Sequence, residues 1–376
     1  MAQAVIDLEA VAHNTRLLAG AAGAAGLMAV VKADGFGHGA TQMTRVALRH
    51  GASWAGVTSA AEALALRADG IEAPILMWLY SPTETFEDLL RNRIDVSVSS
   101  LPSLAAVADA ALRTGTIGYV HLKADTGLSR GGSPIDEWPD LVEWARKYEA
   151  ANLLRVRGVW SHLANAEAID NPRLRTQLNL FAEMRAIAGA VPITHLANSA
   201  ALLQLPETHL DLARPGIALY GVEPVPGRTF GLRPAMTLQA QVILTKRVPA
   251  GAGVSYGPDF VTDRETTLAL LPVGFADGVP RSAGGRAYVA VNGVRCPIVG
   301  RIAMDQCVVD VGDLPVRVGD TAVVFGAGDD GEPTVVDWAG WADTNPHEVL
   351  TGVGPRVERQ YRPVRESSAR VGALAG

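Results

Sequence analysis

The chain has 376 residues, of which 48% are hydrophobic and 19% are charged, and its formal net charge is −6. At this length two domains are expected rather than one. The two signs of charge are interspersed without a basic run, which argues against nucleic acid as a partner.

The sequence contains no apolar stretch long enough to span a bilayer and no apolar signal segment after a charged start. We therefore expect a cytoplasmic protein without a membrane partner. Its two cysteines, Cys296 and Cys307, match no zinc or redox motif in their spacing. We expect both to be reduced core residues, and we expect no metal.

Short β-rich runs alternate with helical stretches from Leu27 to about Tyr220. Helical spacing is found, for example, at Ser59–Ala68 and Pro102–Arg113. Most of the β-rich runs are apolar on both faces, as in parallel strands covered by helices. The expected strands are Leu27–Val31, Trp54–Thr58, Ile75–Tyr80, Asp95–Ser99, Tyr119–Ala124, Val156–His162, Ile193–Leu196 and Leu210–Leu219. Eight β-α units predict a (β/α)8 barrel of the TIM type.

Long runs rich in valine and threonine follow after about Gly227, such as "MTLQAQVILTKRV", "TTLALLPVGF" and "DTAVVFGAGDDG". Helical periodicity is nearly absent there until Pro346–Leu350. We therefore expect an α/β fold with a barrel over residues 8–228 and a mostly-β C-terminal domain over residues 229–376. Residues 1–7 form a strand that could pair with either domain, and we expect it to join the β domain.

Polar residues gather where the expected barrel strands end, which is where a barrel of this kind carries its chemistry. The ends of the second, third and fourth strands carry nothing comparable. The candidate residues come from the other five strand ends: the first supplies Lys32, the fifth Lys123 and Arg130, the sixth His162, the seventh His195, Asn198 and Ser199, and the eighth Arg214, Gly216 and Ile217. Each alone could be an ordinary polar strand end, but that interpretation weakens when they are taken together.

Two of these residues predict an anion site between the last two loops. Ser199 stands near the start of a helix, where N–H groups attract an anion, and Gly216 lets backbone approach a ligand closely. Lys32 could form a Schiff base with an aldehyde in the same cavity, where the following glycines would let the loop pass close to the ligand. A phosphate beside such a lysine indicates pyridoxal phosphate. An aldolase on this fold would satisfy the same logic.

The motif "VVKADGFGHG" around Lys32 resembles the lysine signature of the alanine racemases, usually written with KANAYGHG. "LKADTGLSR", "WSHLA", "HLANS", "ARPGIALYG", "GVSYG", "GFADGVPR" and "VGRIAMDQ" follow in the family's order over nearly the whole chain. The resemblance implies a head-to-tail homodimer with shared active sites and pyridoxal phosphate bound to Lys32. It also implies interconversion of L- and D-alanine, which supplies D-alanine for peptidoglycan.

The resemblance also implies which residues act as bases. Lys32 would be one base, and Tyr256 in "GVSYG" would be the other, reaching the opposite face of the substrate from the partner subunit. Racemisation needs both, because one group removes the α-proton and another returns a proton on the other face. Tyrosine is a weak base, so cationic neighbours must favour its phenolate; the candidates are the His162–Arg214–His195 network and Arg130.

Other matched residues would bind cofactor and substrate. Arg214 would face the pyridine nitrogen and, being a cation, leave it unprotonated, which weakens the cofactor as an electron sink. Arg130 would hold the phenolic oxygen and the substrate carboxylate, and Lys123 matches a position that is often carbamylated to orient that arginine. The remaining matches are Asn198 beside the ring, Ser199 with the amides of Gly216 and Ile217 at the phosphate, and the partner's Met304 and Asp305 at the substrate.

The sequence departs from the family at four tyrosine positions, now Phe36, Phe275, His347 and Pro355. A racemase for another small amino acid such as serine is one alternative, because Phe275 alters the entry corridor. A paralogue that binds the cofactor with little turnover is another, although both bases are retained. A basic amino-acid decarboxylase fits less well, because the chain lacks a paired-cysteine substrate loop and Tyr256 has no role in that chemistry.

Overall fold

The computed structural model describes residues 1–257 and 259–364. Residue 258 and the last part of the predicted β domain, residues 365–376, lie outside the described residues.

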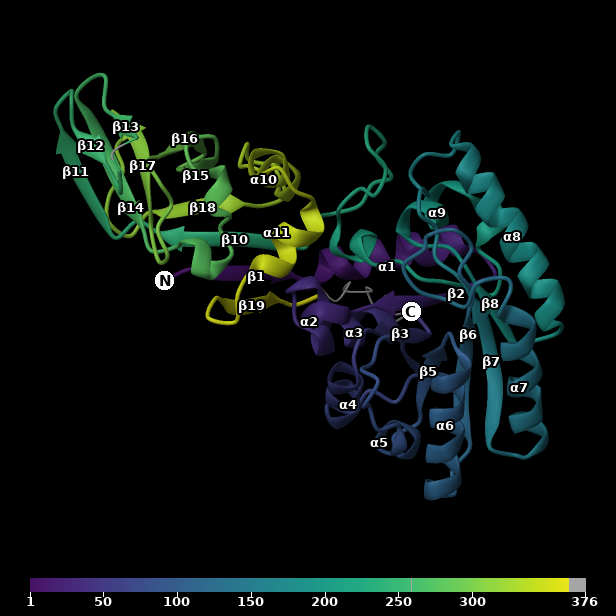
Figure 1. Cartoon of the computed structure of the whole chain (residues 1–376). Coiled ribbons are helices and arrows are strands. Elements are labelled where there is room, and N and C mark those ends of the chain that lie inside the picture. The colour runs from purple at the N-terminus through teal and green to yellow at the C-terminus, as the bar shows by residue number, and fades with distance from the viewer. Residues whose placement is uncertain (258, 365–376) are drawn as a thin grey trace, which may run out of the picture.

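Eight parallel strands form a nearly closed barrel, with helices around it (Figure 1). Seven of them lie in chain order, and the last strand pairs with the first, Gly26 beside Leu212. The amide of Asp211 donates to the Thr194 carbonyl at 3.0 Å, which links the remaining pair of strands. The barrel strands are β2 (Gly26–Val30), β3 (Trp54–Val57), β4 (Ile75–Met77), β5 (Ile94–Val98), β6 (Gly118–Lys123), β7 (Leu154–Trp160), β8 (Ile193–His195) and β9 (Leu212–Ala213). The predicted barrel is confirmed.

Helices follow the barrel strands, and several begin at side-chain caps. Ser59 and Glu62 form a capping box at one of them, and Ser100 caps another, so both expected helical stretches are present. Helix α1 (Leu8–Ala22) precedes the first barrel strand. The helices that follow barrel strands are α2 (Lys32–Phe36), α3 (Ala40–Arg49), α4 (Ala60–Ala68), α5 (Glu87–Arg91), α6 (Leu101–Thr114), α7 (Trp138–Ala150), α8 (Pro172–Ala188) and α9 (Ser199–Gln204).

The last expected strand, Leu210–Leu219, is too long. Strand β9 ends at Ala213, and a 3-10 helix, η2 (Ile217–Tyr220), replaces the rest. Pro215 has no N–H to donate to a neighbouring strand, and Gly216 has φ −112° and ψ −88°, which is not extended backbone. The strand therefore ends at Ala213, and a loop follows it at the C-terminal end of the barrel strands.

The C-terminal part is mostly β, as predicted, and contains a nine-stranded sheet in the order β11-β14-β17-β16-β15-β18-β10-β1-β19. The N-terminal strand β1 (Gln3–Asp7) lies in this sheet, antiparallel to β10 and parallel to β19. The other strands are β10 (Met236–Gln241), β11 (Leu244–Val248), β14 (Thr266–Leu271), β15 (Tyr288–Val291), β16 (Val294–Val299), β17 (Cys307–Gly312), β18 (Thr321–Phe325) and β19 (Glu358–Arg362), with β12 (Gly253–Val254) and β13 (Phe260–Val261) forming a separate pair.

The C-terminal part of the chain also contains two α-helices. The expected helix near the C-terminus is α11 (Pro346–Gly352), but α10 (Val335–Ala342) was not predicted. Thr334 caps α10, and the fully buried Trp338 donates from its indole to the Val324 carbonyl at 2.6 Å. No helix in the described ranges is long and apolar enough to cross a membrane.

The two cysteines, Cys296 and Cys307, are buried free thiols, as expected. Burial raises the pKa of Cys307 to about 12, so it stays an unreactive thiol in the core.

Candidate active site

The short segment α2, which begins at Lys32 one residue after β2, is a strained left-handed turn and not a regular helix. Ala33, Asp34 and Phe36 have φ values of 51°, 52° and 53°, and Gly35 between them has φ 61°. Non-glycine residues in this conformation cost roughly 1–2 kcal/mol each. Strain of this kind persists where the surrounding structure enforces it, and it is typical of functional sites.

The lysine turn is held from the barrel side by Glu62 of α4. One carboxylate oxygen of Glu62 accepts from the Ala33 amide at 2.7 Å, and the other accepts from the Thr58 amide at 2.8 Å. Burial and the charge of Arg130 lower the pKa of Lys32, while Glu62 opposes that shift. A lysine with a lowered pKa is a better nucleophile toward an aldehyde at neutral pH.

A second lysine, Lys123, ends β6 on the same side of the barrel. Its ammonium lies 4.8 Å from the centroid of the Trp160 ring, at cation-π distance. Burial, then the charges of Arg130 and Arg214, lower the pKa of Lys123 to about 8. Arg130 itself is exposed, on the loop that follows β6.

The buried cation of the cluster is Arg214, which is 5% exposed and follows β9. Nη1 lies 3.1 Å from Nδ1 of His195, and Nη2 lies 3.5 Å from Nδ1 of His162. Burial lowers the pKa of Arg214 to about 9, which still leaves it charged at neutral pH. Burial and the nearby cations, Arg214 first, lower the pKa of His162 to about 3, so His162 is neutral. The predicted His162–Arg214–His195 arrangement is therefore present as a contact network.

The loop between β9 and η2 is fixed by Ser199. Its Oγ accepts from the amides of Gly216 at 2.9 Å and Ala218 at 3.3 Å. The amide of Ile217, between those two, has no acceptor within the part of the chain that the structure describes. Asn198 caps α9 by accepting from the Ala201 amide at 3.0 Å. The serine that we predicted as a phosphate ligand thus also shapes the loop.

The remaining predicted residues lie in the C-terminal part of the chain. Tyr256 is 71% exposed and Met304 is 55% exposed. Asp305 accepts from Arg356 Nη2 at 2.7 Å. Figure 1 shows β12 and β13, which flank Tyr256, at the outer end of the C-terminal sheet and far from β2. One chain alone therefore does not bring Tyr256 to Lys32.

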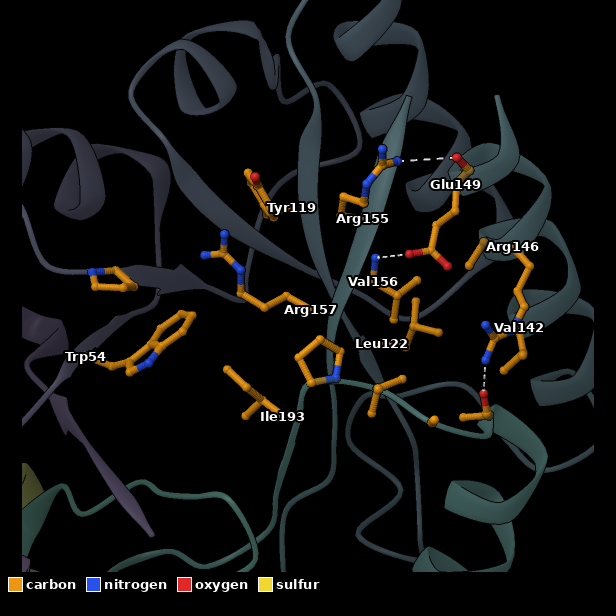
Figure 2. Close-up of a pocket in the computed structure, with 16 residues that line it drawn as sticks. Trp54, Tyr119, Leu122, Val142, Arg146, Glu149, Arg155, Val156, Arg157 and Ile193 are labelled. Carbon is orange, nitrogen blue, oxygen red and sulfur yellow. Dashed lines mark hydrogen bonds between the residues drawn. The ribbon is translucent and has the colours of Figure 1, made fainter. Parts of the chain in front are cut away.

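A cavity of about 720 Å³ lies at the opposite end of the barrel, where β6, β7 and β8 begin (Figure 2). Several of its polar groups already have protein partners: Glu149 accepts from the Val156 amide at 2.9 Å, and Arg155 donates to the Glu149 carbonyl at 3.3 Å. Because barrel enzymes carry their chemistry at the other end, we place the active site at the strand-end cluster around Lys32.

Comparison with known families settles the relationship. Residues 6–224 match the model of the alanine racemase N-terminal domain, and residues 235–361 match that of the alanine racemase C-terminal domain. The chain belongs to the alanine racemase family. It is an enzyme of the isomerase class.

Individual alanine racemases are similar over nearly their whole length. The alanine racemase of Thermobifida fusca is 50% identical over 365 residues, 96% of this chain and 98% of that protein. The crystal structure of the alanine racemase from D-cycloserine-producing Streptomyces lavendulae has a TM-score of 0.95 at 47% identity and covers 96% of this chain and 97% of that one. That from Bartonella henselae, with covalently bound pyridoxal phosphate, has a TM-score of 0.87 at 30% identity and covers 96% and 99%.

Sequence reasoning missed two residues of this alanine racemase site. Glu62 holds the lysine turn, although its sequence signal, a glutamate three residues after Ser59, indicates only a helix cap. Trp160 stacks on His195 with 5.5 Å between centroids and 4° between planes, and it also lies under Arg214. The motif "WSHLA" contained this tryptophan, but nothing in its spacing points to a stacking role.

Proposed function

We propose that this chain interconverts L- and D-alanine with pyridoxal phosphate held by Lys32, and that Tyr256 of a partner subunit completes each site. The observation that carries the proposal is the position of Lys32, a half-buried lysine at a barrel strand end whose pKa is lowered by burial and by the charge of Arg130. The Bartonella henselae relative, with its covalently bound pyridoxal phosphate, supports the choice of cofactor.

The residues present fit this cofactor. A phosphate suits the loop that Ser199 shapes, because the Ile217 amide is available beside the small Gly216. Arg214 is buried without a carboxylate contact among the described residues, so an acceptor such as a pyridine nitrogen would complement its charge. When bound, pyridoxal phosphate withdraws electrons from the substrate and makes its α-proton acidic.

The chain's own groups then move the proton. Lys32 Nζ would take or return the α-proton on one face of the substrate, and the Tyr256 hydroxyl would do so on the other. Arg130 would bind the substrate carboxylate and so fix which face each base meets. The exposure of Tyr256 in the single chain supports a head-to-tail homodimer, since only a second copy would bring the two bases together. From the family we further propose a cytoplasmic role in supplying D-alanine for peptidoglycan.

Incubation of the purified protein with L-alanine in D2O tests the proposal. We expect deuterium at the α-carbon and loss of optical rotation, and we expect Lys32→Ala to lose both together with the visible cofactor band. Exchange with L-serine but not L-alanine would show another substrate. A bound cofactor without any exchange would mean a binding protein, and carbon dioxide release would mean a decarboxylase.

A further inference from the structure

A line of hydrogen-bonded side chains crosses the barrel interior, starting at Arg214 near the C-terminal ends of the strands. Beyond the contact of Arg214 with His195, Nε2 of His195 lies 2.8 Å from Nδ1 of His121 on β6. Nε2 of His121 lies 3.2 Å from Oδ2 of Asp95, the second residue of β5. All four residues are at most 5% exposed. Barrel interiors are dominated by branched apolar side chains, so this polar line is unusual.

The direction of every bond in the line follows from Arg214. A guanidinium only donates, so His195 must accept through Nδ1 and, as a neutral ring, carry its proton on Nε2. His195 then donates to Nδ1 of His121, which donates through its own Nε2 to the Asp95 carboxylate. Burial and the charge of Arg214 hold the pKa of His195 well below its usual value, in agreement with a neutral ring. All bonds therefore point from Arg214 toward Asp95.

The far end of the line is anchored on β7. Nη1 of Arg157 lies 3.0 Å from both carboxylate oxygens of Asp95, and its guanidinium carbon lies 3.8 Å from the centroid of the Tyr119 ring. Figure 2 shows Arg157 at the wall of the cavity, between Tyr119 and Trp54. A Cβ at Gly158 would lie 2.3 Å from Nδ1 of His121, so a glycine is needed beside this ring.

The line gives the buried Arg214 a polarised hydrogen-bond acceptor, because the Asp95 carboxylate itself is already paired with Arg157. A buried cation is costly unless it is paired and hydrogen-bonded, and Arg214 forms no ion pair with a carboxylate of the described residues. Its Nη2 donates to the carbonyls of Ser161 at 2.8 Å and Leu196 at 3.2 Å, and the hydrogen bond from Nη1 to His195 leads through two imidazoles to Asp95. Hydrogen bonds in such a chain polarise one another at low dielectric, which makes Nδ1 of His195 a stronger acceptor.

We propose that Asp95 and His121 are positioning residues of the racemase: they fix and polarise His195, the acceptor that orients the Arg214 guanidinium. The proposal rests on the proposed function, in which Arg214 faces the cofactor. Neither residue would touch cofactor or substrate.

The test compares Asp95→Asn, His195→Gln and the double variant in the full holoenzyme. Asp211→Asn is the matched control: Oδ2 of Asp211 accepts from the amide and hydroxyl of Thr194, at 2.7 and 2.6 Å, beside His195 but outside the line. We expect Asp95→Asn to lower kcat by about tenfold, the equivalent of one charge-assisted hydrogen bond, with little change in KM. The double variant should lose no more than His195→Gln alone. Asp211→Asn combined with His195→Gln should be additive.

A second measurement tests the line whether or not the protein racemises alanine. In 15N-histidine spectra of the protein as purified, His195 and His121 should each carry a proton on Nε2 only, and His195 should stay neutral between about pH 6 and pH 9 because its pKa lies well below the usual value. Their signals are assigned by loss in His195→Gln and His121→Gln, and Asp95→Asn should shift the His195 signal. A proton on Nδ1 of His195, or additive kcat losses for Asp95→Asn and His195→Gln, would overturn the proposal.

Discussion

Arg359 of β19 donates from Nε to the carbonyl oxygen of Gly37, 3.0 Å away, and so connects the C-terminal sheet to the turn that begins at Lys32. The same guanidinium donates to the carbonyls of Val353 and Val357, each at 2.7 Å. Gly37 has φ +80°, and a Cβ there would lie 2.6 Å from the Leu350 carbonyl oxygen. The C-terminal part of the chain therefore helps to hold the strained lysine turn in place.

Replacing Arg359 by methionine should destabilise the protein and loosen that turn. Methionine keeps the aliphatic bulk but leaves the carbonyl groups without their charged donor, and a hydrogen bond to a charged group contributes about 1.5–3 kcal/mol. We expect a loss of at least about 2 kcal/mol, seen as a lower Tm, and faster cofactor loss on dialysis. Arg362→Met, an exposed change on the same strand, is the control. Equal Tm values for both variants would show that Arg359 does not support the turn.

The lowered pKa of Lys123 predicts that this lysine is carbamylated. Carbamate forms from the neutral amine, and with a pKa of about 8 roughly a quarter of Lys123 is neutral at pH 7.5, against about 0.1% for an ordinary lysine. Incubation with 13C-bicarbonate should give a carbamate signal that Lys123→Ala lacks. The signal should decrease as the pH falls below about 8, because protonation removes the reactive amine. An identical signal in Lys123→Ala would exclude this site.

Tyr256→Phe should affect the two alanine enantiomers differently. The change removes the hydroxyl of one proposed base and leaves the Lys32 side untouched. Deuterium exchange from one enantiomer should therefore collapse, while exchange from the other continues through Lys32, and the visible cofactor band should remain. The measurement is the initial rate of α-deuteration for each enantiomer. Equal losses for both would remove the reason to assign Tyr256 to a single face.

Mixed dimers should recover activity from two inactive variants. Because β12 and β13, which flank Tyr256, lie at the outer end of the C-terminal sheet and far from α2, which begins at Lys32, each proposed site takes its two bases from different copies. Lys32→Ala and Tyr256→Phe chains should then form heterodimers with up to one intact site. Subunit exchange is verified with differently tagged chains before assay. Verified heterodimers without activity would count against a shared site.

The barrel could be predicted because each strand is short, apolar on both faces and followed by a helix. The candidate site could be predicted because barrel enzymes carry their catalytic residues at the C-terminal ends of the strands. The left-handed turn at Ala33–Phe36 could not be predicted, because three of its residues are not glycine and have no local preference for positive φ. That the nearby glycines let the loop approach a ligand stays a prediction; Gly37 in addition packs against the C-terminal segment, where a Cβ would meet the Leu350 carbonyl oxygen.

Two further features depend on tertiary contacts that local patterns do not encode. Helix α10 has the sequence "VVDWAGWA", which is too apolar on all sides to show helical periodicity. Asp95 and His121 lie within strands, where the sequence alone does not distinguish a buried polar residue from an exposed one. Their contact forms only when the barrel folds. The boundary between residues 228 and 229 stays a prediction.

Phe36→Tyr should strengthen cofactor retention. The Phe36 ring is 4% exposed and lies 4.7 Å from the Tyr220 ring, and its Cζ would lie 3.2 Å from a Cβ on Gly216. A tyrosine hydroxyl would extend from that carbon toward the proposed phosphate loop. A donated hydrogen bond to a phosphate dianion contributes about 1.5–3 kcal/mol, so pyridoxal phosphate should bind about tenfold more tightly or better.

The competing outcome is a buried hydroxyl without a partner, which would lower Tm without improving retention. Phe181→Tyr is the control for that cost, because Phe181 is 2% exposed on α8 and no predicted cofactor ligand lies on that helix. Absorbance during dialysis measures cofactor loss for the wild type and both variants. We expect slower loss for Phe36→Tyr alone. Unchanged or faster loss would mean that the phosphate does not lie beside Phe36, or that other donors already saturate it.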